Sequence, residues 1–242
     1  MANLLTYCAG DPLQPIALIR TPFPDKFSIP RQPGLAPSVT ARIEFTGDFD
    51  HLASIQGIEQ HSHLWLLFEF NQHRDHGWRE RVRPPRLGGN KSIGVFATRS
   101  PFRPNNIGLS VVKLVEVVRE PEVALVVAGA DLLDQTPIMD IKPYVPYVDC
   151  LPDARSEFAQ AKPAPLSVHF TDQARLQLSE HQQLRPELGA VLVEVLSQDP
   201  RPAYHASKNP DKRYASRLYD LDVHWHVRDQ QLWVTAITGD HD

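Results

Sequence analysis

Hydrophobic positions between Pro15 and Tyr147 form short runs rich in β-branched and aromatic residues, separated by Gly, Pro and Asn. This pattern is typical of strands joined by turns. Helical stretches of 10–15 residues do not separate the runs, so a doubly wound parallel sheet is disfavoured and an antiparallel barrel or sandwich is favoured. One helix is predicted at residues 48–56, after an Asp cap. The predicted strands are residues 16–19, 41–45, 64–70, 93–97, 109–118 and 123–127.

The pattern changes after residues 150–166, a Pro- and Ala-rich stretch that is predicted to be a linker. Beyond it, helical spacing alternates with strand-like runs. The predicted elements are a strand at 168–170, a helix at 171–178, a helix at 185–197 and strands at 217–227 and 231–237, with a turn at 228–230. The sequence therefore predicts a mainly β (α+β) protein, with an antiparallel β-barrel domain over residues 14–150 and a small α/β domain over residues 165–242.

Composition restricts the class of protein. The 242 residues are 42% hydrophobic, which is enough for a substantial core. Since no run approaches 18 apolar residues and the first 20 residues lack the pattern of a signal peptide, we expect no membrane span and a cytoplasmic location. Two cysteines, Cys8 and Cys150, are too few for a disulfide framework and are expected to be free thiols.

Positive charge is concentrated in residues 74–103, which carry eight Lys or Arg and two acids. The segment has a formal charge of +6, whereas the whole chain is −4, so the remaining residues total −10. Such a segment predicts a local surface for an anion, with nucleic acid or phosphate as the leading ligands. The alternative is a plain solvated face, but Trp78, Pro84 and Pro85 are unusual in a solvated helix.

Three proline-braced loops could hold polar groups at fixed positions. Residues 26–33 place Arg31 and Gln32 between two prolines, either as a ligand-binding turn or as a rigid surface turn. Residues 94–108 mix cations with neutral donors, as a phosphate or nucleobase site requires. Residues 197–204 could face RNA or the first domain, or could simply end a helix. The polar residues of the last two loops are Arg99, Ser100, Arg103, Asn105, Asp199, Arg201 and Tyr204.

Three carboxylates, Asp131, Asp134 and Asp140, fall within ten residues. Together they could bind a divalent metal, act as bases or accept hydrogen bonds. Separately they could serve as turn and capping groups, with Asp140 paired to Lys142. His61 and His63 open an apolar strand, but packing is favoured over metal binding because a third ligand is not evident.

Five segments, in order along nearly the whole chain, resemble the TrmO family of S-adenosylmethionine-dependent tRNA methyltransferases. They are KFSIPRQPGL, GIEQHSHLWLLFEF, RPPRLGGNKSIGVFATRSPFRPNNIGLS, DLLDQTPIMDIKPYVPY and QDPRPAY. The resemblance implies a β-barrel methyltransferase domain with a small C-terminal domain, acting as a homodimer without a metal. The implied reaction converts N6-threonylcarbamoyladenosine at position 37 of threonine tRNA to its N6-methyl derivative.

The resemblance also implies the site residues. The cofactor-contacting positions would be Arg31, Gln32, Pro33, Asn71, Gln72, Arg99, Leu109, Ala128, Gly129, Ala130 and Asp131. We hypothesise that Arg31, Arg99 or Arg103 binds the threonyl carboxylate or carbamoyl oxygen and that Asp131 orients the cofactor, while the general base is unassigned. Two positions depart from the family pattern: Asn106 stands where a proline is expected, and Gln135 where a glycine is expected.

Two rival functions predict different behaviour. A non-catalytic RNA-binding barrel would bind RNA without affinity for S-adenosylmethionine. A divalent-metal hydrolase using Asp131, Asp134 and Asp140 would lose activity in the presence of a chelator.

Overall fold

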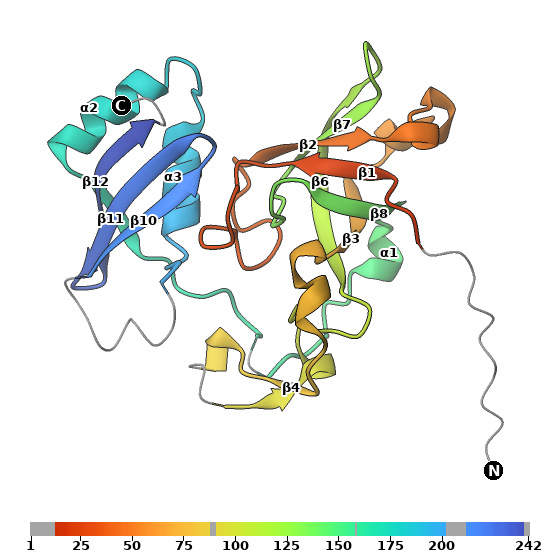
Figure 1. The fold of residues 1–242 in the computed structure, drawn as a ribbon, viewed down its shortest axis with the longest axis horizontal. Helices are drawn as coiled ribbons and strands as arrows, with labels where there is room; N and C mark the ends of the chain where they lie inside the picture. Colours follow the sequence, from red (N-terminus) through yellow and green to blue (C-terminus); the bar gives the residue numbers. More distant parts are fainter. Residues whose placement is uncertain (1–12, 88–90, 158, 202–211, 240–242) are drawn as a thin grey trace.

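A computed structural model describes residues 13–87, 91–157, 159–201 and 212–239 (Figure 1). The largest sheet of the protein is a closed antiparallel barrel with strand order β1-β2-β7-β6-β3-β8, which confirms the predicted mainly β fold. Strand β8 pairs with both β1 and β3 and so closes the barrel. The barrel strands are β1 (Ala17–Arg20), β2 (Thr40–Phe45), β3 (His63–Glu69), β6 (Ile107–Val118), β7 (Ala124–Ala128) and β8 (Thr136–Pro143).

Alternation of side chains explains why these strands close around a core. In β3 every second residue points inward, so Leu64, Leu66 and Phe68 are buried while their neighbours are partly exposed. Ala41 and Ile43 of β2 do the same from the opposite wall. Closure pairs every barrel strand on both sides and leaves no open edge.

Several short elements connect the barrel strands. The predicted helix at 48–56 is wrong: the structure has two separate 3-10 helices there, and of their residues only Ile55 is buried, which leaves too narrow an apolar stripe to hold a longer helix. The predicted strand at 93–97 ends at Gly94 and turns into a 3-10 helix. Strand β8 was not predicted. The connecting elements are η1 (Gly47–Phe49), η2 (Leu52–Ile55), η3 (Ile58–Gln60), η4 (Asn71–His76), β4 (Arg81–Val82), η5 (Pro85–Leu87), β5 (Ile93–Gly94) and η6 (Val95–Ala97); the short helix α1 (Pro146–Asp149) follows the last barrel strand.

A second, four-stranded sheet with order β10-β11-β12-β9 follows residues 150–166 (the connecting segment), and α2 and α3 pack against this sheet (Figure 1). The predicted cap of α2 is confirmed, because the Thr171 side chain accepts a hydrogen bond from the Ala174 amide. The predicted strand at 217–227 is wrong: the chain turns at Tyr219, whose φ is 57°, and forms the hairpin β10–β11. The elements are β9 (Ser167–Phe170), α2 (Asp172–His181), α3 (Leu188–Leu196), β10 (Arg213–Leu218), β11 (Leu221–Arg228) and β12 (Gln231–Gly239).

The chain between β1 and β2 belongs to the core of the second sheet. Phe23, Ala36 and Val39 have no exposed surface and pack in the same cluster as Leu192 and Trp225. Residues 21–39, between the first two barrel strands, are therefore held in place by residues from the C-terminal part of the chain.

Among the described residues, no helix has the length and apolar character needed to cross a membrane. Cys150 is a free, exposed thiol, whereas Cys8 lies outside the described residues.

Candidate functional site

A cavity of about 1350 Å³ opens where three segments meet: the turn at residues 31–33 (the RQP turn), the loop at 79–102, and the connecting segment at 156–162. Six cationic residues line it, and none of the described residues in its wall carries a carboxylate. A concave surface of one sign of charge concentrates anions. The cations are Arg31, Arg79, Arg81, Arg83, Arg99 and Lys162.

The RQP turn lies against two other predicted site segments. Gln32 Oε1 accepts a hydrogen bond from Arg99 Nη1 at 2.7 Å. The Gly34 amide donates to the Gly129 carbonyl at 2.9 Å. Gly129 has φ +78°, and a Cβ there would lie 3.2 Å from the Gly34 Cα, so this close backbone approach requires glycine. The structure thus brings residues 31–34, 99 and 128–131 together.

Asp131 follows β7, and its carboxylate faces Ser110, near the start of β6. Its Oδ1 accepts a hydrogen bond from Ser110 Oγ at 2.5 Å. Burial raises the pKa of Asp131 to about 6, although the Ser110 hydroxyl, the residue's own backbone amide and the Arg99 charge all act to lower it. Ser110 is fully buried and was missed from the sequence. Its one signal was a hydroxyl between the apolar positions Gly108 and Val112, which alternate with it along β6.

Arg103 braces its own loop. Its Nη1 donates to the carbonyl oxygens of Val95 at 3.2 Å and Thr98 at 2.7 Å. The guanidinium also lies 5.6 Å from the centre of the Phe96 ring. Arg103 is absent from the cavity wall, so its position suits it to shaping the loop that carries Arg99.

The remaining predicted contacts lie at different places. Asn71 and Gln72 are exposed on η4 and do not line the cavity. Leu109 on β6 is 49% exposed. Arg31 points toward the loop after α3, where its Nη2 donates to the carbonyls of Asp199 at 3.4 Å and Arg201 at 3.3 Å.

The loop after α3 is held by its own ion pair. The Asp199 carboxylate takes two hydrogen bonds from Arg201, each 2.7 Å long. A bidentate pair of this kind fixes the loop that receives Arg31. Tyr204 lies outside the described residues.

The three carboxylates of the metal hypothesis point to different partners. Asp134 Oδ1 accepts from the Thr21 amide at 2.9 Å, and Asp140 forms an ion pair with Lys142 at 2.8 Å. The contacts of Asp134 and Asp140 fit turn and pairing roles, whereas Asp131 accepts its hydrogen bond from Ser110 of β6. Among the described residues, no group of three or more His, Cys, Asp or Glu side chains is arranged to hold a metal ion.

Both departures from the family pattern have positive φ. Asn106 has φ 49°, an angle that proline cannot adopt, so the backbone of this loop depends on not having proline there. Gln135 has φ 61°, the left-handed region in which a glycine is expected and a larger side chain is strained.

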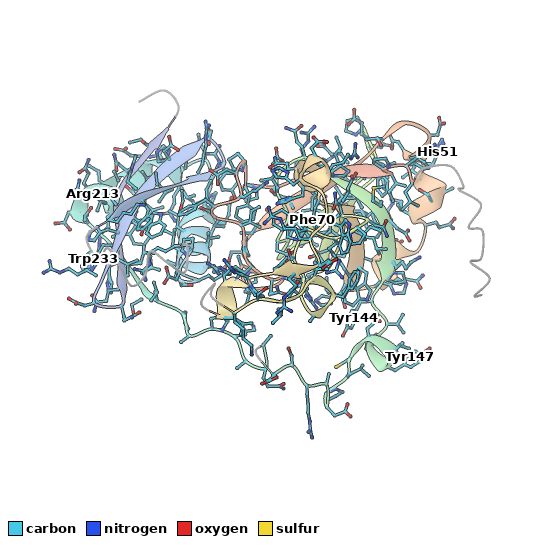
Figure 2. All side chains as sticks on the ribbon, turned by 60° about the horizontal axis from the view of Figure 1, so that its bottom comes forward. His51, Phe70, Tyr144, Tyr147, Arg213 and Trp233 are labelled. Atoms are coloured by element: carbon cyan, nitrogen blue, oxygen red, sulfur yellow. The ribbon has the colours of Figure 1, made fainter. Side chains whose placement is uncertain are left out.

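An exposed apolar patch covers part of the barrel's outer surface. Figure 2 shows Tyr144 and Tyr147 on the side of the barrel away from the sheet that carries Arg213 and Trp233. A hollow of about 500 Å³ lies within the patch, beside Trp65, whose Nε1 donates to Asp149 Oδ2 at 3.0 Å. The exposed apolar residues of β6, of α1 and just after α1 are Ile107, Leu109, Val115, Tyr147, Val148 and Leu151.

Comparisons with known proteins cover nearly the whole chain. The family model of the tRNA-methyltransferase O N-terminal domain matches residues 18–150, and that of the TrmO C-terminal domain matches residues 163–240. The chain is 46% identical to the tRNA (adenine(37)-N6)-methyltransferase of Escherichia coli strain K12, over 92% of this chain and 95% of that protein. It is 51% identical to a Pseudomonas aeruginosa protein named putative S-adenosylmethionine-dependent methyltransferase RcsF, over 94% of this chain and 97% of that one.

Solved structures agree with these matches. The crystal structure of TrmO from Pseudomonas aeruginosa superposes with a TM-score of 0.80 at 42% identity, covering 95% of this chain and 99% of that chain.

Proposed function

The chain belongs to the TrmO family of S-adenosylmethionine-dependent tRNA (adenine-N6) methyltransferases, and we propose that its substrate is N6-threonylcarbamoyladenosine at position 37 of threonine tRNA. The observation that carries the proposal is the joining of a cationic cavity to the cluster of Gln32, Arg99 and Asp131. The cavity suits a polyanion, and the cluster suits a small zwitterionic cofactor.

The residues present fit S-adenosylmethionine. Its amino-acid end carries one positive and one negative group, and Arg99 and Asp131 offer one charge of each sign near each other. Gly34 and Gly129 add no side-chain bulk where the RQP turn meets residues 128–131. When bound, S-adenosylmethionine supplies a methyl group on a positively charged sulfur, a leaving group that is already activated.

The methyl donor is already activated, so the main task of the protein is to align the methyl group with the accepting nitrogen. Each proposed catalytic residue then has a role in positioning. Asp131, held by Ser110, would orient the cofactor. Arg99, held by Gln32, would bind the carboxylate of the threonyl group or stabilise negative charge that develops on the carbamoyl oxygen. Arg103 would keep the Arg99 loop in shape. Arg31 lines the same cavity and is the second candidate for the threonyl carboxylate.

The cavity wall also suits single-stranded RNA. Phe96 lines it with 72% of its surface exposed, and exposed aromatic rings are platforms for unstacked bases. Arg79, Arg81 and Arg83 lie along the same wall and would meet phosphates. An anticodon loop, with bases turned outward on a charged backbone, has the matching chemistry.

We further propose a homodimer. The exposed apolar side chains of β6 and α1, beside the hollow at Trp65, form the surface best suited to a second copy, since exposed apolar patches mark protein–protein interaction sites. A sedimentation measurement that gives a monomer at micromolar concentration would contradict the proposed homodimer.

The division of the chain into a domain at residues 14–150 and a domain at residues 165–242 stays a prediction.

The site assignment is tested by Arg99→Ala and Asp131→Ala. We expect each to weaken binding of S-adenosylmethionine or lower turnover by about tenfold or more, as loss of a charged contact does. Normal affinity and turnover in both variants would refute the assignment. Binding of tRNA by the wild type without any affinity for S-adenosylmethionine would instead support the non-catalytic RNA-binding alternative.

A further inference from the structure

The RQP turn projects from a segment whose two flanks are buried in the C-terminal part of the chain. Before the turn, the Phe27 ring stacks on Tyr214 and Trp225, with centroids 6.3 and 6.1 Å apart. After the turn, Ala36 and Val39 are fully buried against α3 and the second sheet. The shape of the turn is therefore set on both sides by residues outside the barrel.

A single carboxylate fixes the end of this segment. The two oxygens of Glu194, on α3, accept hydrogen bonds from the amide and the hydroxyl of Ser38, each 2.8 Å long. Hydrogen bonds to an ionised acceptor are stronger than neutral ones, and two from the same residue also fix its orientation. Gln198, one turn along from Glu194, donates to the Glu194 carbonyl at 2.9 Å and to the Leu35 carbonyl at 3.5 Å.

Ser38 leads directly to the cluster of proposed cofactor contacts. The next residue, Val39, accepts a hydrogen bond from the Gly129 amide at 2.9 Å. The Gly129 carbonyl in turn accepts from the Gly34 amide at 2.9 Å, and Asp131 lies two residues further on. Glu194 is thus connected through Ser38 and Val39 to both the RQP turn and residues 128–131.

From this geometry we propose that Glu194 is a positioning residue for the cofactor site, and that α3 holds the RQP turn in its binding shape. The role of Glu194 in cofactor binding rests on the proposed function, whereas the hydrogen bonds that link Glu194 to the turn do not depend on it. The C-terminal unit then contributes to methyl transfer without touching the reacting atoms.

The test is Glu194→Ala, with Glu180→Ala as the matched control, because Glu180 is an exposed carboxylate on the neighbouring helix α2. We expect binding of S-adenosylmethionine, measured by calorimetry, to weaken about tenfold in Glu194→Ala and to stay unchanged in the control. Turnover at saturating S-adenosylmethionine should stay within about twofold of wild type, so that the loss falls on KM and not on kcat.

Hydrogen exchange separates positioning from general destabilisation. Amides of residues 30–39 should exchange faster in Glu194→Ala, while those of β11 and β12 keep wild-type protection. Ser38→Ala should weaken binding about threefold, and the double variant should bind no more weakly than Glu194→Ala alone, since both changes remove the same contact. Additive losses, or unchanged exchange at residues 30–39, would overturn the proposal.

The two proposals fail in different ways. A wild-type protein with no affinity for S-adenosylmethionine would refute the proposed function, and exchange at residues 30–39 would still decide whether Glu194 holds the turn. A wild type that binds normally, together with a Glu194→Ala variant that binds equally well, would refute the role of Glu194 alone.

Discussion

Replacement of Asp131 by Asn is expected to make the protein more stable and less active. Burial raises the pKa of this carboxyl from 3.8 to about 6, so at neutral pH the folded protein carries a charge that is costly to bury. The difference between these two values is worth about 3 kcal/mol at pH 7, as an upper bound. Asp131 is mostly packed but keeps some surface open to solvent, which screens its charge, so we expect about 1–2 kcal/mol. The Asn side-chain oxygen can still accept the hydrogen bond from Ser110.

The sign of the effect fixes its pH dependence. A carboxyl with a raised pKa in the folded state favours folding when protonated, so this contribution is present below about pH 4 and is lost as pH rises to about 6. Asn at position 131 does not ionise, so the Asp131→Asn variant does not lose this contribution to the free energy of unfolding. Urea unfolding of both proteins at pH 4, 5, 6 and 7.5 should therefore give nearly equal free energies of unfolding at pH 4 and a growing advantage for the Asp131→Asn variant above it.

A control and a binding measurement complete the test. Asp140→Asn, which breaks the exposed ion pair with Lys142, should change the free energy of unfolding by less than about 0.5 kcal/mol at every pH. Asp131→Asn should also weaken S-adenosylmethionine binding about tenfold, since a buried charge retained at a cost is typical of a functional site. An Asp131→Asn variant that is less stable than wild type at pH 7.5, or a difference that does not vary with pH, would refute the reasoning.

Three further outcomes are expected. Gly108→Ala should lower the free energy of unfolding, measured with urea, by about 1–3 kcal/mol because its Cβ would overlap the Phe68 ring; Gly94→Ala, with no atom within 4 Å of the added carbon, should be near neutral in the same assay. Arg83→Gln should weaken tRNA binding and reduce the magnitude of the slope of log K against log salt by about one, with S-adenosylmethionine binding unchanged; an unchanged slope would remove Arg83 from the RNA surface. Methylation should persist in excess EDTA, whereas loss of methylation would support the hypothesis of a divalent-metal site.

The strands with alternating or β-branched runs were predictable because their burial repeats every two residues along the chain. Strand β8 was not, since Pro137 and Asp140 interrupt its apolar pattern, although the barrel closes through pairing with β1 and β3. The hairpin at Tyr219 was missed for a similar reason: a tyrosine gives no sequence signal for a left-handed backbone. Tertiary contacts override local preference at such positions.

The site could be predicted as a set of segments but not as an arrangement. The RQP turn and the Arg99 loop carried visible signals, namely paired prolines and clustered polar residues. Ser110 and Glu194 carried almost none, because their importance lies in partners 21 and 156 residues away in the sequence. Arg103 looked like an anion ligand by composition, and its bonds to the Val95 and Thr98 carbonyls became evident only in three dimensions.

The central claim is tested most directly by nucleoside mass spectrometry on threonine tRNA that carries N6-threonylcarbamoyladenosine, incubated with the purified protein and S-adenosylmethionine. We predict a gain of one methyl group on that nucleoside, and none on tRNA that lacks the threonylcarbamoyl modification. Absence of methylation on the modified tRNA, with S-adenosylmethionine bound normally, would contradict the proposed substrate.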